Sequence, residues 1–456
     1  MTDRLAAVVL AAGMGTRMKS ERPKVLHPVA GKPMIDWALD AAVAVGADPV
    51  VVVTAPGQQA VRDAVAGRAA TAIQEQALGT GDAVKPARDA LAAIAAAGGT
   101  VLVLYGDTPM ITPATLARMV EARAAHERPA VVVLGFEPAD PALYGRLVLG
   151  ADHGLDRIVE ARDAGPVERE IGLCNGGVMA IDAAELFPML DAIGNANAKG
   201  EFYLTDIVGI ARARDRRCAV VTCEPIEPMG VDSRAGLAAA EAAMQARLRA
   251  AAMAEGATLV APETVFLSHD TRLGRDVTVH PHVVFGLGVT VADGAEIRSF
   301  SHLEGARVAT GAIVGPYARL RPGADIGEGA HIGNFVEIKN ATVEAGAKAN
   351  HLSYVGDARI GAGANIGAGT ITCNYDGFAK HHTDIGAGAF IGSNTALVAP
   401  VRVGDGAIVG AGSTVTRDVA ADAMTVVRGE ERTIAGGAAR FRSRRSKPAG
   451  PGTGKS

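Results

Sequence analysis

The sequence has little excess charge of either sign: its formal net charge is -4, from 45 basic and 49 acidic residues. This balance produces no broad positive field, which argues against nucleic acid as an electrostatic partner. Long apolar runs are also lacking. The first apolar stretch, within MTDRLAAVVLAAG, is too short to cross a membrane and passes directly into a glycine turn. We therefore expect a cytoplasmic protein with small-molecule substrates, and neither nucleic acid nor membrane as a partner.

Cysteine is scarce as well. The four cysteines are scattered along the chain without a CxxC pair: Cys174, Cys218, Cys223 and Cys373. This spacing favours neither a disulfide framework nor a zinc site. Buried free thiols in a reducing compartment are the expectation that remains.

The chain is rich in apolar residues, which make up 48% of its 456 positions, and it is longer than one hydrophobic core usually organises. Up to about residue 230, short β-branched runs such as PVVVVT (49–54) and VLVLYGD (101–107) alternate with longer amphipathic stretches. Continuous apolar strands separated by helices indicate a mostly parallel, Rossmann-like α/β sheet covered on both faces. In such sheets, ligands bind beyond the carboxyl ends of the strands.

Residues 234–255 contain no proline and are dense in alanine, leucine, glutamate and arginine, which are good helix formers. We predict one helix here, about 33 Å long, that links two domains. The final residues are basic and rich in glycine, proline and serine, a composition typical of disorder. The predicted organisation is a first domain over 1–233, the linker helix over 234–255, a second domain over 256–438 and a disordered tail over 439–456.

Beyond residue 258, large apolar residues recur at intervals of six. A period of six is a multiple of the strand period of two but not of the helical 3.6, so it predicts short strands whose inward side chains recur once per side. Stacked sides joined by tight corners make a parallel β-helix, and we expect a left-handed hexapeptide-repeat form in which each coil buries its neighbour. The recurring anchors are Val308, Val314, Leu320, Ile326, Ile332, Ile338, Ile385, Ile391, Leu397, Val403, Val409 and Val415.

The repeat is interrupted near 297–308, 339–360 and 373–384, and the last interruption has the sequence CNYDGFAKHHTD. A polar excursion from a regular solenoid is either a tolerated surface insertion or a functional loop. Because polar residues cluster on both sides of it, we favour a functional loop.

The first strand ends in a glycine-containing turn, LAAGMGTR, and Lys24 follows shortly after. Glycines allow backbone N–H groups to approach phosphate oxygens, while Arg17 and Lys24 supply positive charge for a triphosphate. The turn is not a P-loop, because no Gly-Lys-Ser/Thr follows. Asp107 comes at the end of another apolar strand, where it could bridge a divalent cation to phosphates or could simply cap a helix.

Several motifs stand in one order along the chain: LAAGMGTRM with PKVLHPVAGKPM, QALGTGDA, YGDTPM, YGR, IVEARDA, CNGGV, EFYLTD and GVDSR. Together they resemble the sugar-nucleotide pyrophosphorylases, and specifically the family of bifunctional N-acetylglucosamine-1-phosphate uridylyltransferases and glucosamine-1-phosphate acetyltransferases. The resemblance covers nearly the whole chain. It implies acetyl transfer from acetyl-CoA to glucosamine 1-phosphate, followed by uridylyl transfer from UTP to N-acetylglucosamine 1-phosphate with release of pyrophosphate.

In the first domain, the resemblance implies that Arg17 and Lys24 act on the phosphates and that Asp107 and Asp232 hold Mg²⁺. The family pattern has asparagine at position 232, so the charge of the site differs here. Ala77 also stands where a glutamine is common. The implied nucleotide and sugar contacts are Leu10, Ala11, Ala12, Gly13, Lys24, Gln74, Gly79, Thr80, Tyr105, Gly106, Asp107, Gly145, Glu160, Asn175 and Asp232.

In the second domain, polar residues gather at the interruptions of the repeat. An imidazole with a pKa near ~6.5 can accept the proton of an amine that attacks a thioester. The resemblance implies that His351 is this general base, that Arg321 and Lys339 bind the sugar phosphate, and that Tyr354 and Asn365 orient the sugar. It also implies a homotrimer, in which one interface is used three times. The implied acetyl-CoA contacts are Ala368, Asn374, Tyr375, Ser393, Ala411 and Arg428.

Two other interpretations stay open at the level of sequence. One is a nucleotidyltransferase for another sugar or base, whose β-helix serves structure or regulation only. The other is a nucleotide-binding scaffold without turnover. The first alternative does not require His351, Lys339 and Arg321 or the loop over 373–384, which therefore argue against it. Lys24 with the two aspartates argues against the second.

Overall fold

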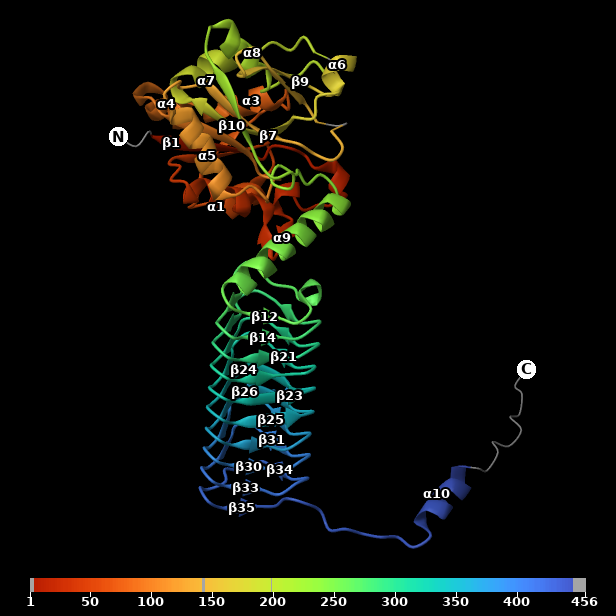
Figure 1. Ribbon diagram of the computed structural model, residues 1–456. Helices are drawn as coiled ribbons and strands as arrows, with labels where there is room; N and C mark the ends of the chain where they lie inside the picture. Colours follow the sequence, from red (N-terminus) through yellow and green to blue (C-terminus); the bar gives the residue numbers. More distant parts are fainter. Residues whose placement is uncertain (1–3, 142–143, 198, 446–456) are drawn as a thin grey trace, which may run out of the picture. The chain divides into compact units, whose positions relative to one another are not determined.

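The computed structural model describes residues 4–141, 144–197 and 199–445 (Figure 1). It divides into two compact units. The N-terminal unit comprises Met1–Glu255, Ala261–Thr271 and Phe285–Gly288, and the C-terminal unit comprises Gly256–Val260, Arg272–Val284 and Val289–Ser456.

A mixed, mostly parallel sheet forms the centre of the N-terminal unit. Only β10 runs antiparallel to its neighbours β7 and β6 along the main path, and β8 (Arg146–Leu149) and β9 (Leu155–Val159) form an antiparallel pair beside it. The predicted α/β fold is therefore confirmed. The strand order is β11 (Cys218–Thr222), β7 (Val131–Phe136), β10 (Cys174–Asp182), β6 (Thr100–Tyr105), β1 (Leu5–Leu10), β4 (Val50–Thr54) and β5 (Ala70–Ile73).

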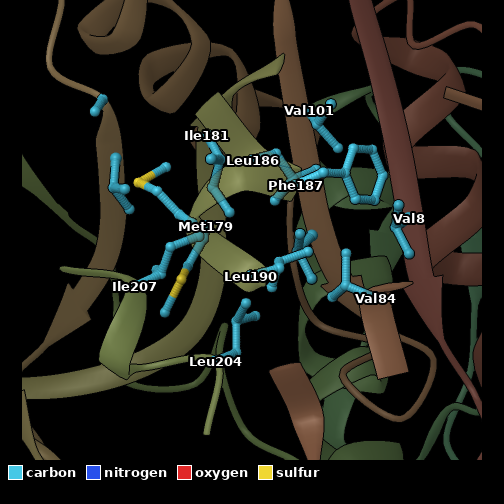
Figure 2. Close-up of a cluster of buried hydrophobic side chains, with 14 of the residues drawn as sticks. Val8, Val84, Val101, Met179, Ile181, Leu186, Phe187, Leu190, Leu204 and Ile207 are labelled. Atoms are coloured by element: carbon cyan, nitrogen blue, oxygen red, sulfur yellow. The ribbon is translucent and has the colours of Figure 1, made fainter. Parts of the chain in front are cut away.

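Helices cover both faces of this sheet. Because neighbouring side chains of a strand point to opposite faces, Val8 and Val9 belong to two different buried clusters. Figure 2 shows the cluster of Val8, in which Leu186, Phe187 and Leu190 pack against the sheet. On that face lie α3 (Thr80–Val84), α4 (Arg88–Ala97), α7 (Ala183–Leu190) and α8 (Asp206–Ala213), and on the other lie α1 (Met34–Ala44), α2 (Gln59–Val65) and α5 (Pro113–Ala124).

The helix α9 (Arg234–Ala254) begins after Ser233, whose Oγ accepts a hydrogen bond from the N–H of Gly236 at 3.1 Å. Its buried residues Ala240 and Met244 pack in a cluster with Met34 and Met110. The helix therefore groups with the N-terminal unit. The domain boundaries suggested by the sequence stay predictions.

The C-terminal unit is a parallel β-helix of short stacked strands (Figure 1). One sheet contains β12 (Thr258–Leu259), β14 (Thr278–Val279), β17 (Glu296–Ile297), β20 (Ile313–Val314), β23 (His331–Asn334), β25 (Lys348–His351), β27 (Asn365–Ile366), β30 (Phe390–Ile391), β33 (Ile408–Val409) and β35 (Met424–Thr425). The other sides contain β13 (Arg272–Leu273), β15 (Val284–Phe285), β16 (Thr290–Val291), β18 (His302–Leu303), β19 (Ala306–Val308), β21 (Arg319–Leu320), β22 (Ala324–Ile326), β24 (Glu337–Val343), β26 (Tyr354–Ile360), β28 (Ile371–Cys373), β29 (Thr383–Ile385), β31 (Ala396–Val398), β32 (Val401–Val403) and β34 (Thr414–Val415).

The hexad anchors form the interior of this β-helix, and all twelve are buried. Val308 pairs with Ile326, three hexads further along, so each coil takes up three sides. Ile360 pairs with Ile385 instead, because the excursion over 373–384 lengthens that coil. The predicted repeat and its interruption are thus confirmed.

The tail that the sequence predicts to be disordered is described as far as Arg445, and this part ends in a helix, α10 (Gly437–Arg445). Residues 446–456 lie outside the described residues. All four cysteines are free; Cys174 and Cys218 are buried, whereas Cys223 and Cys373 are half-buried. Within the part of the chain that the structure describes, each helix is too short or too polar to cross a bilayer.

Candidate active sites

The first pocket opens at the carboxyl ends of β1 and β6 and has a volume of about 300 Å³. The turn after β1 needs glycine, because Gly15 has a φ of +61° and a Cβ there would lie 2.6 Å from the Cβ of Lys24. Gly106 lies beside the pocket, where its N–H donates to the carbonyl of Leu10 at 2.9 Å. The predicted residues that line the pocket are Leu10, Ala11, Ala12, Gly13, Lys24, Gln74, Gly79, Thr80, Tyr105 and Asp107.

Hydrogen bonds orient two polar side chains that line this pocket, those of Gln74 and Thr80. Gln74 is buried, and its Nε2 donates to Asp82 Oδ2 at 2.9 Å. The hydroxyl of Thr80 accepts from the N–H of Leu204 at 3.0 Å. These contacts fix an amide and a hydroxyl in positions suited to the polar edge of a base.

The second pocket has a volume of about 650 Å³, and its lining includes Arg17, Tyr144, Glu160 and Asp232. Glu160 accepts a hydrogen bond from the hydroxyl of Thr205 at 3.0 Å. A carboxylate held in this way is suited to accept from sugar hydroxyls. The pocket therefore offers both a cation and a carboxylate to a sugar phosphate.

The predicted sugar contacts Gly145 and Asn175 lie beside each other. The N–H of Asn175 donates to the carbonyl of Gly145 at 2.8 Å, and its side-chain oxygen accepts from the N–H of Gly177 at 2.9 Å. Asn175 stands where the pairing of β10 with β7 shifts register. Such irregularities turn a side chain away from its regular direction.

A cluster of four charges connects the two pockets. Lys24 bonds to Asp107 and, at 2.8 Å, to Asp232, while Arg17 contacts Asp232 at 2.9 Å. Burial alone would lower the pKa of Lys24, but the two carboxylates outweigh it and raise the pKa above its ordinary value. Burial would likewise raise the pKa of Asp232, yet Lys24 and Arg17 hold it below its usual range. Lys24 and Asp232 therefore stay charged near neutral pH.

The donor set fits a magnesium ion. Asp107 and Asp232 bond to the same ammonium group, so their oxygens converge on one point. Mg²⁺ is usually held by one or two carboxylates together with phosphate oxygens of the substrate. Among the described residues, no group of three or more histidine, cysteine, aspartate or glutamate side chains is placed to hold a metal. An ion at this point would consequently take its remaining oxygen ligands from the nucleotide and from water.

The cations predicted for the second site lie along one face of the β-helix. Arg321 follows β21 and lies beside β24, since its N–H donates to the carbonyl of Ile338 at 2.8 Å. Lys339 belongs to the same β24, and β26, which begins at Tyr354, pairs with it. The loop over 373–384 supplies Lys380, whose pKa is lowered by a hydrogen bond with Lys339 and by the positive charge of Lys339. The structure thus brings the loop to the predicted cations.

Asp357 balances part of this positive charge. It lies 3.6 Å from Lys339, accepts from the side-chain amide of Asn340 at 2.6 Å, and bonds to the amide of Asn374. Burial would raise its pKa, but the two amides and the lysines hold the pKa below its ordinary value. Asp357 therefore links a predicted phosphate contact, Lys339, to a predicted acetyl-CoA contact, Asn374.

The imidazole of His351 lies on the adjoining side of the same coil as Tyr354, separated from it by a corner at Leu352, where φ is +50°. Its Nδ1 lies 3.0 Å from the side-chain oxygen of Asn334 on the preceding coil. An amide oxygen can only accept, so this contact assigns the proton to Nδ1. Nε2 is then left with its lone pair available as a base.

A column of corners runs along the β-helix from His351. Backbone hydrogen bonds stack the corner of each coil on the next: His351 accepts from Gly369, Ala368 from Asn394, and Ser393 from Gly412. Ala411 precedes Gly412, and Arg428 packs at Gly410 and Gly412. Four predicted acetyl-CoA contacts, Ala368, Ser393, Ala411 and Arg428, therefore share one column with His351.

The remaining predicted residues lie on two different sides. Asn365 pairs with Lys348, so it lies one coil after the strand that ends at His351. Tyr375 lies in the loop over 373–384, where it is exposed and its hydroxyl donates to the carbonyl of Gly377 at 2.6 Å.

Some residues of the two sites were not singled out from the sequence. Asp140, Arg162, Lys199 and Tyr203 line the second pocket; Tyr203 belongs to the motif EFYLTD, and Arg162 belongs to the motif IVEARDA. Asn334 and Asp357 occupy outward positions of the repeat, where polar residues are ordinary. Asp357 lies three residues after the predicted residue Tyr354, and this proximity was the one available signal for it.

Together, the fold and the sites define a nucleotidyltransferase joined to a transferase of the hexapeptide-repeat class. Residues 7–165 match the family model of the MobA-like NTP transferase domain, and residues 382–417 match that of the bacterial transferase hexapeptide (six repeats). The chain is 59% identical to the bifunctional protein GlmU of Paramagnetospirillum magneticum, over 98% of each chain. It is 62% identical to that of Rhodospirillum rubrum, over 96% of this chain and 98% of the relative. The chain belongs to the family of the bifunctional protein GlmU.

Proposed function

We propose that the chain catalyses two consecutive steps in the synthesis of UDP-N-acetylglucosamine, a precursor of peptidoglycan and lipopolysaccharide. It first transfers acetyl from acetyl-CoA to glucosamine 1-phosphate, and then uridylyl from UTP to N-acetylglucosamine 1-phosphate. The observation that best supports this proposal is the charge cluster between the two N-terminal pockets, in which Lys24 is held by both Asp107 and Asp232.

In uridylyl transfer, a phosphate oxygen of N-acetylglucosamine 1-phosphate attacks the α-phosphorus of UTP, and the bond to pyrophosphate breaks. The nucleophile is already an anion, so no general base is required; alignment and charge neutralisation determine the rate. Lys24 and Arg17 neutralise the approaching phosphates. Asp107 and Asp232 would hold Mg²⁺, which when bound supplies further positive charge to the phosphates.

The two pockets divide the substrates between them. The residues of LAAG, with Gln74 and Thr80, bind the uridine nucleotide in the first pocket. Glu160 and Asn175 bind the sugar in or beside the second pocket. The position of the charge cluster between the pockets supports this division.

In acetyl transfer, Nε2 of His351 accepts a proton from the amine of glucosamine 1-phosphate while the nitrogen attacks the thioester carbonyl. The carbon–sulfur bond then breaks, and the leaving sulfur takes up a proton, so that coenzyme A departs as a thiol. Arg321 and Lys339 bind the sugar phosphate, and Tyr354 and Asn365 orient the sugar. The hydrogen bond from Nδ1 to Asn334 supports the role of His351.

Acetyl-CoA binds along the column of corners that begins at His351. The column contains Ala368, Ser393, Ala411 and Arg428, and Asn374 and Tyr375 approach from the loop over 373–384. Small side chains at these corners leave room for an extended ligand beside the backbone. Arg428 is placed to meet a phosphate of the cofactor.

The enzyme acts as a homotrimer in the cytoplasm. Closed cyclic symmetry with one repeated interface suits the straight sides of a β-helix. Sedimentation at concentrations over several decades would measure the oligomeric state. A monomer at all concentrations would contradict the trimer and leave the two activities as proposed.

The two activities can be tested in one reaction. Glucosamine 1-phosphate, acetyl-CoA, UTP and Mg²⁺ are supplied, and free thiol and pyrophosphate are followed separately. We expect His351→Ala to abolish thiol release while pyrophosphate still forms from added N-acetylglucosamine 1-phosphate. Asp107→Ala should do the reverse. Loss of both activities in either variant would contradict two independent sites.

A further inference from the structure

The segment between Arg17 and Lys24 has little regular structure of its own. It runs between two 3-10 turns, η1 (Thr16–Met18) and η2 (Lys24–Leu26), and residues 19–22 are exposed. The chain turns sharply at Lys19, where φ is +47°. The two cations that act on the phosphates are thus carried at the ends of a loop, and their positions depend on what holds those ends.

One side chain from a distant part of the chain contacts both ends. Arg234, the first residue of α9, donates through Nε to the carbonyl of Met18 at 3.1 Å. Its Nη1 lies 3.4 Å from Nδ1 of His27. Met18 directly follows Arg17, and His27 directly follows the turn that contains Lys24. Both anchors are buried, with exposed fractions of 1% and 3%.

His27 is suited to accept this contact. Burial lowers its pKa, and the positive charges of Arg234 and Arg22 lower it further. The ring is therefore neutral, and the guanidinium can only donate, so Nδ1 must carry the lone pair. The other ring nitrogen, Nε2, is buried and makes no hydrogen bond of regular geometry. The ring is consequently held by its packing, by Arg234 and by a backbone contact with Arg22.

The anchor point of Arg234 is itself fixed. Asp232, two residues earlier, pairs with both Arg17 and Lys24. Further along α9, Glu241 accepts from the N–H of Ala30 at 2.7 Å, so the helix is attached to the region that follows His27. The residues around the start of α9 therefore contact the loop in two ways. Asp232 forms ion pairs with its cations, and Arg234 donates a hydrogen bond to its backbone.

We propose that Arg234 is a positioning residue for uridylyl transfer. Its contacts with Met18 and His27 hold the two ends of the loop and so set the positions of Arg17 and Lys24. This inference rests on the proposed function of those two cations. Arg234 acts through them, at one remove from the reacting atoms. Without Arg234, Arg17 and Lys24 are still present, but their side chains should be poorly aligned with the phosphates. Misalignment of reacting groups slows catalysis strongly.

The test compares Arg234→Met, Arg234→Lys and Arg249→Met in the full-length enzyme. Methionine keeps the apolar stem and removes the guanidinium. Arg249 is the matched control, because it lies on the same helix and donates to the backbone of Glu263 and Val265. For each variant, kcat and KM are measured for UTP and for N-acetylglucosamine 1-phosphate, together with thermal unfolding followed by the fluorescence of Trp37.

We expect Arg234→Met to lower kcat for uridylyl transfer by about tenfold to a hundredfold, with a much smaller change in either KM. Arg234→Lys can restore one of the two contacts and should recover part of the loss. Arg249→Met should leave kcat unchanged. Acetyl transfer should be the same in all three variants.

An unchanged kcat in Arg234→Met would overturn the inference. So would a loss of kcat matched by Arg249→Met at a similar shift in unfolding temperature, since that result indicates a structural role. Lys24→Ala separates this failure from that of the proposed function. If Lys24→Ala keeps full uridylyl transfer, the proposed role of Lys24 is wrong. If Lys24→Ala is inactive while Arg234→Met keeps full activity, only the positioning role of Arg234 is wrong.

Discussion

At the scale of single residues, short polar contacts determine where the protons of the proposed site residues lie. The side-chain oxygen of Asn334 faces Nδ1 of His351 and thereby selects the tautomer whose Nε2 can act as a base. The charge cluster around Lys24 works differently, since its ion pairs raise the pKa of Lys24 and lower the pKa of Asp232. One contact thus orients a ring, whereas the other group of contacts pairs opposite charges.

Asn334→Leu should lower kcat for acetyl transfer by about tenfold, because the lost hydrogen bond no longer favours the productive tautomer. Asn334→Asp should keep most of the activity, since a carboxylate also accepts from Nδ1. Steady-state kinetics of thiol release measures the effect, and uridylyl transfer by the same preparation is the control. Equal activity of the leucine and aspartate variants would contradict this role of Asn334.

Asp232→Asn should make the stability of the N-terminal unit less dependent on acidic pH. The pKa of Asp232 is lower in the folded protein than its usual value near 3.9. Its ion pairs therefore stabilise the fold fully above about pH 4, and this contribution is lost as the pH falls through the lowered pKa. Urea unfolding between pH 3 and 7, followed by the single tryptophan, Trp37, measures the difference. A variant with the same pH dependence as the parent would contradict it.

At the scale of elements, α9 is attached to the N-terminal unit by a buried amide. Gln245 donates to the carbonyl of Leu267 at 2.7 Å and accepts from its N–H at 2.9 Å. The amide of Gln245 thus pairs with both backbone groups of Leu267, as a neighbouring strand would otherwise do. Because both residues are buried, water cannot substitute for it.

Gln245→Leu should lower the free energy of unfolding by about 2–4 kcal/mol, because two backbone groups of Leu267 are left buried without partners. Urea unfolding followed by Trp37 fluorescence measures the change. The exposed Gln59 on α2 provides the control, since Gln59→Leu should change stability by less than about 0.5 kcal/mol. A similar effect of both substitutions would show that burial of the amide is unimportant.

The elements differ in how far the sequence could predict them. The six-residue period predicted the interior of the β-helix, because a side chain every six positions must point inward in short stacked strands. The packing of α9 could not be foreseen, since its alanine-rich sequence marks no clear apolar face and its contacts with Met34 and Met110 are remote in sequence. Asp357 and Asn334 were missed because a polar residue on the outer face of a repeat is ordinary. The roles of the other site residues stay predictions.

At the scale of the whole molecule, the chain consists of two units that each bury a core of their own. The N-terminal core joins distant strands and helices, whereas the β-helix is stabilised coil by coil through contacts between neighbours. Damage to one core should therefore leave the chemistry of the other unit intact.

Leu320→Ala should destabilise the β-helix by about 2–5 kcal/mol, since a fully buried side chain is replaced by a cavity. Acetyl transfer should then be lost at a lower temperature, while the unfolding transition of Trp37 stays in place. Residual activity after heating measures the first effect. Ile408→Ala is the control, because Ile408 points outward and is 40% exposed. A parallel shift of the Trp37 transition would contradict independent units.

The column of stacked corners limits how insertions and deletions in the sequence could alter the length of the β-helix. Coils rise by about 4.8 Å each, so the distance from His351 to the corner at Ala411, three coils further, is about 14 Å. Stacked sides can be added or removed only as whole coils if the interior is to be preserved, whereas an outward loop such as 373–384 leaves the stack unchanged. The length of the column along which an acyl carrier could lie can therefore change only in steps of one coil, about 4.8 Å each.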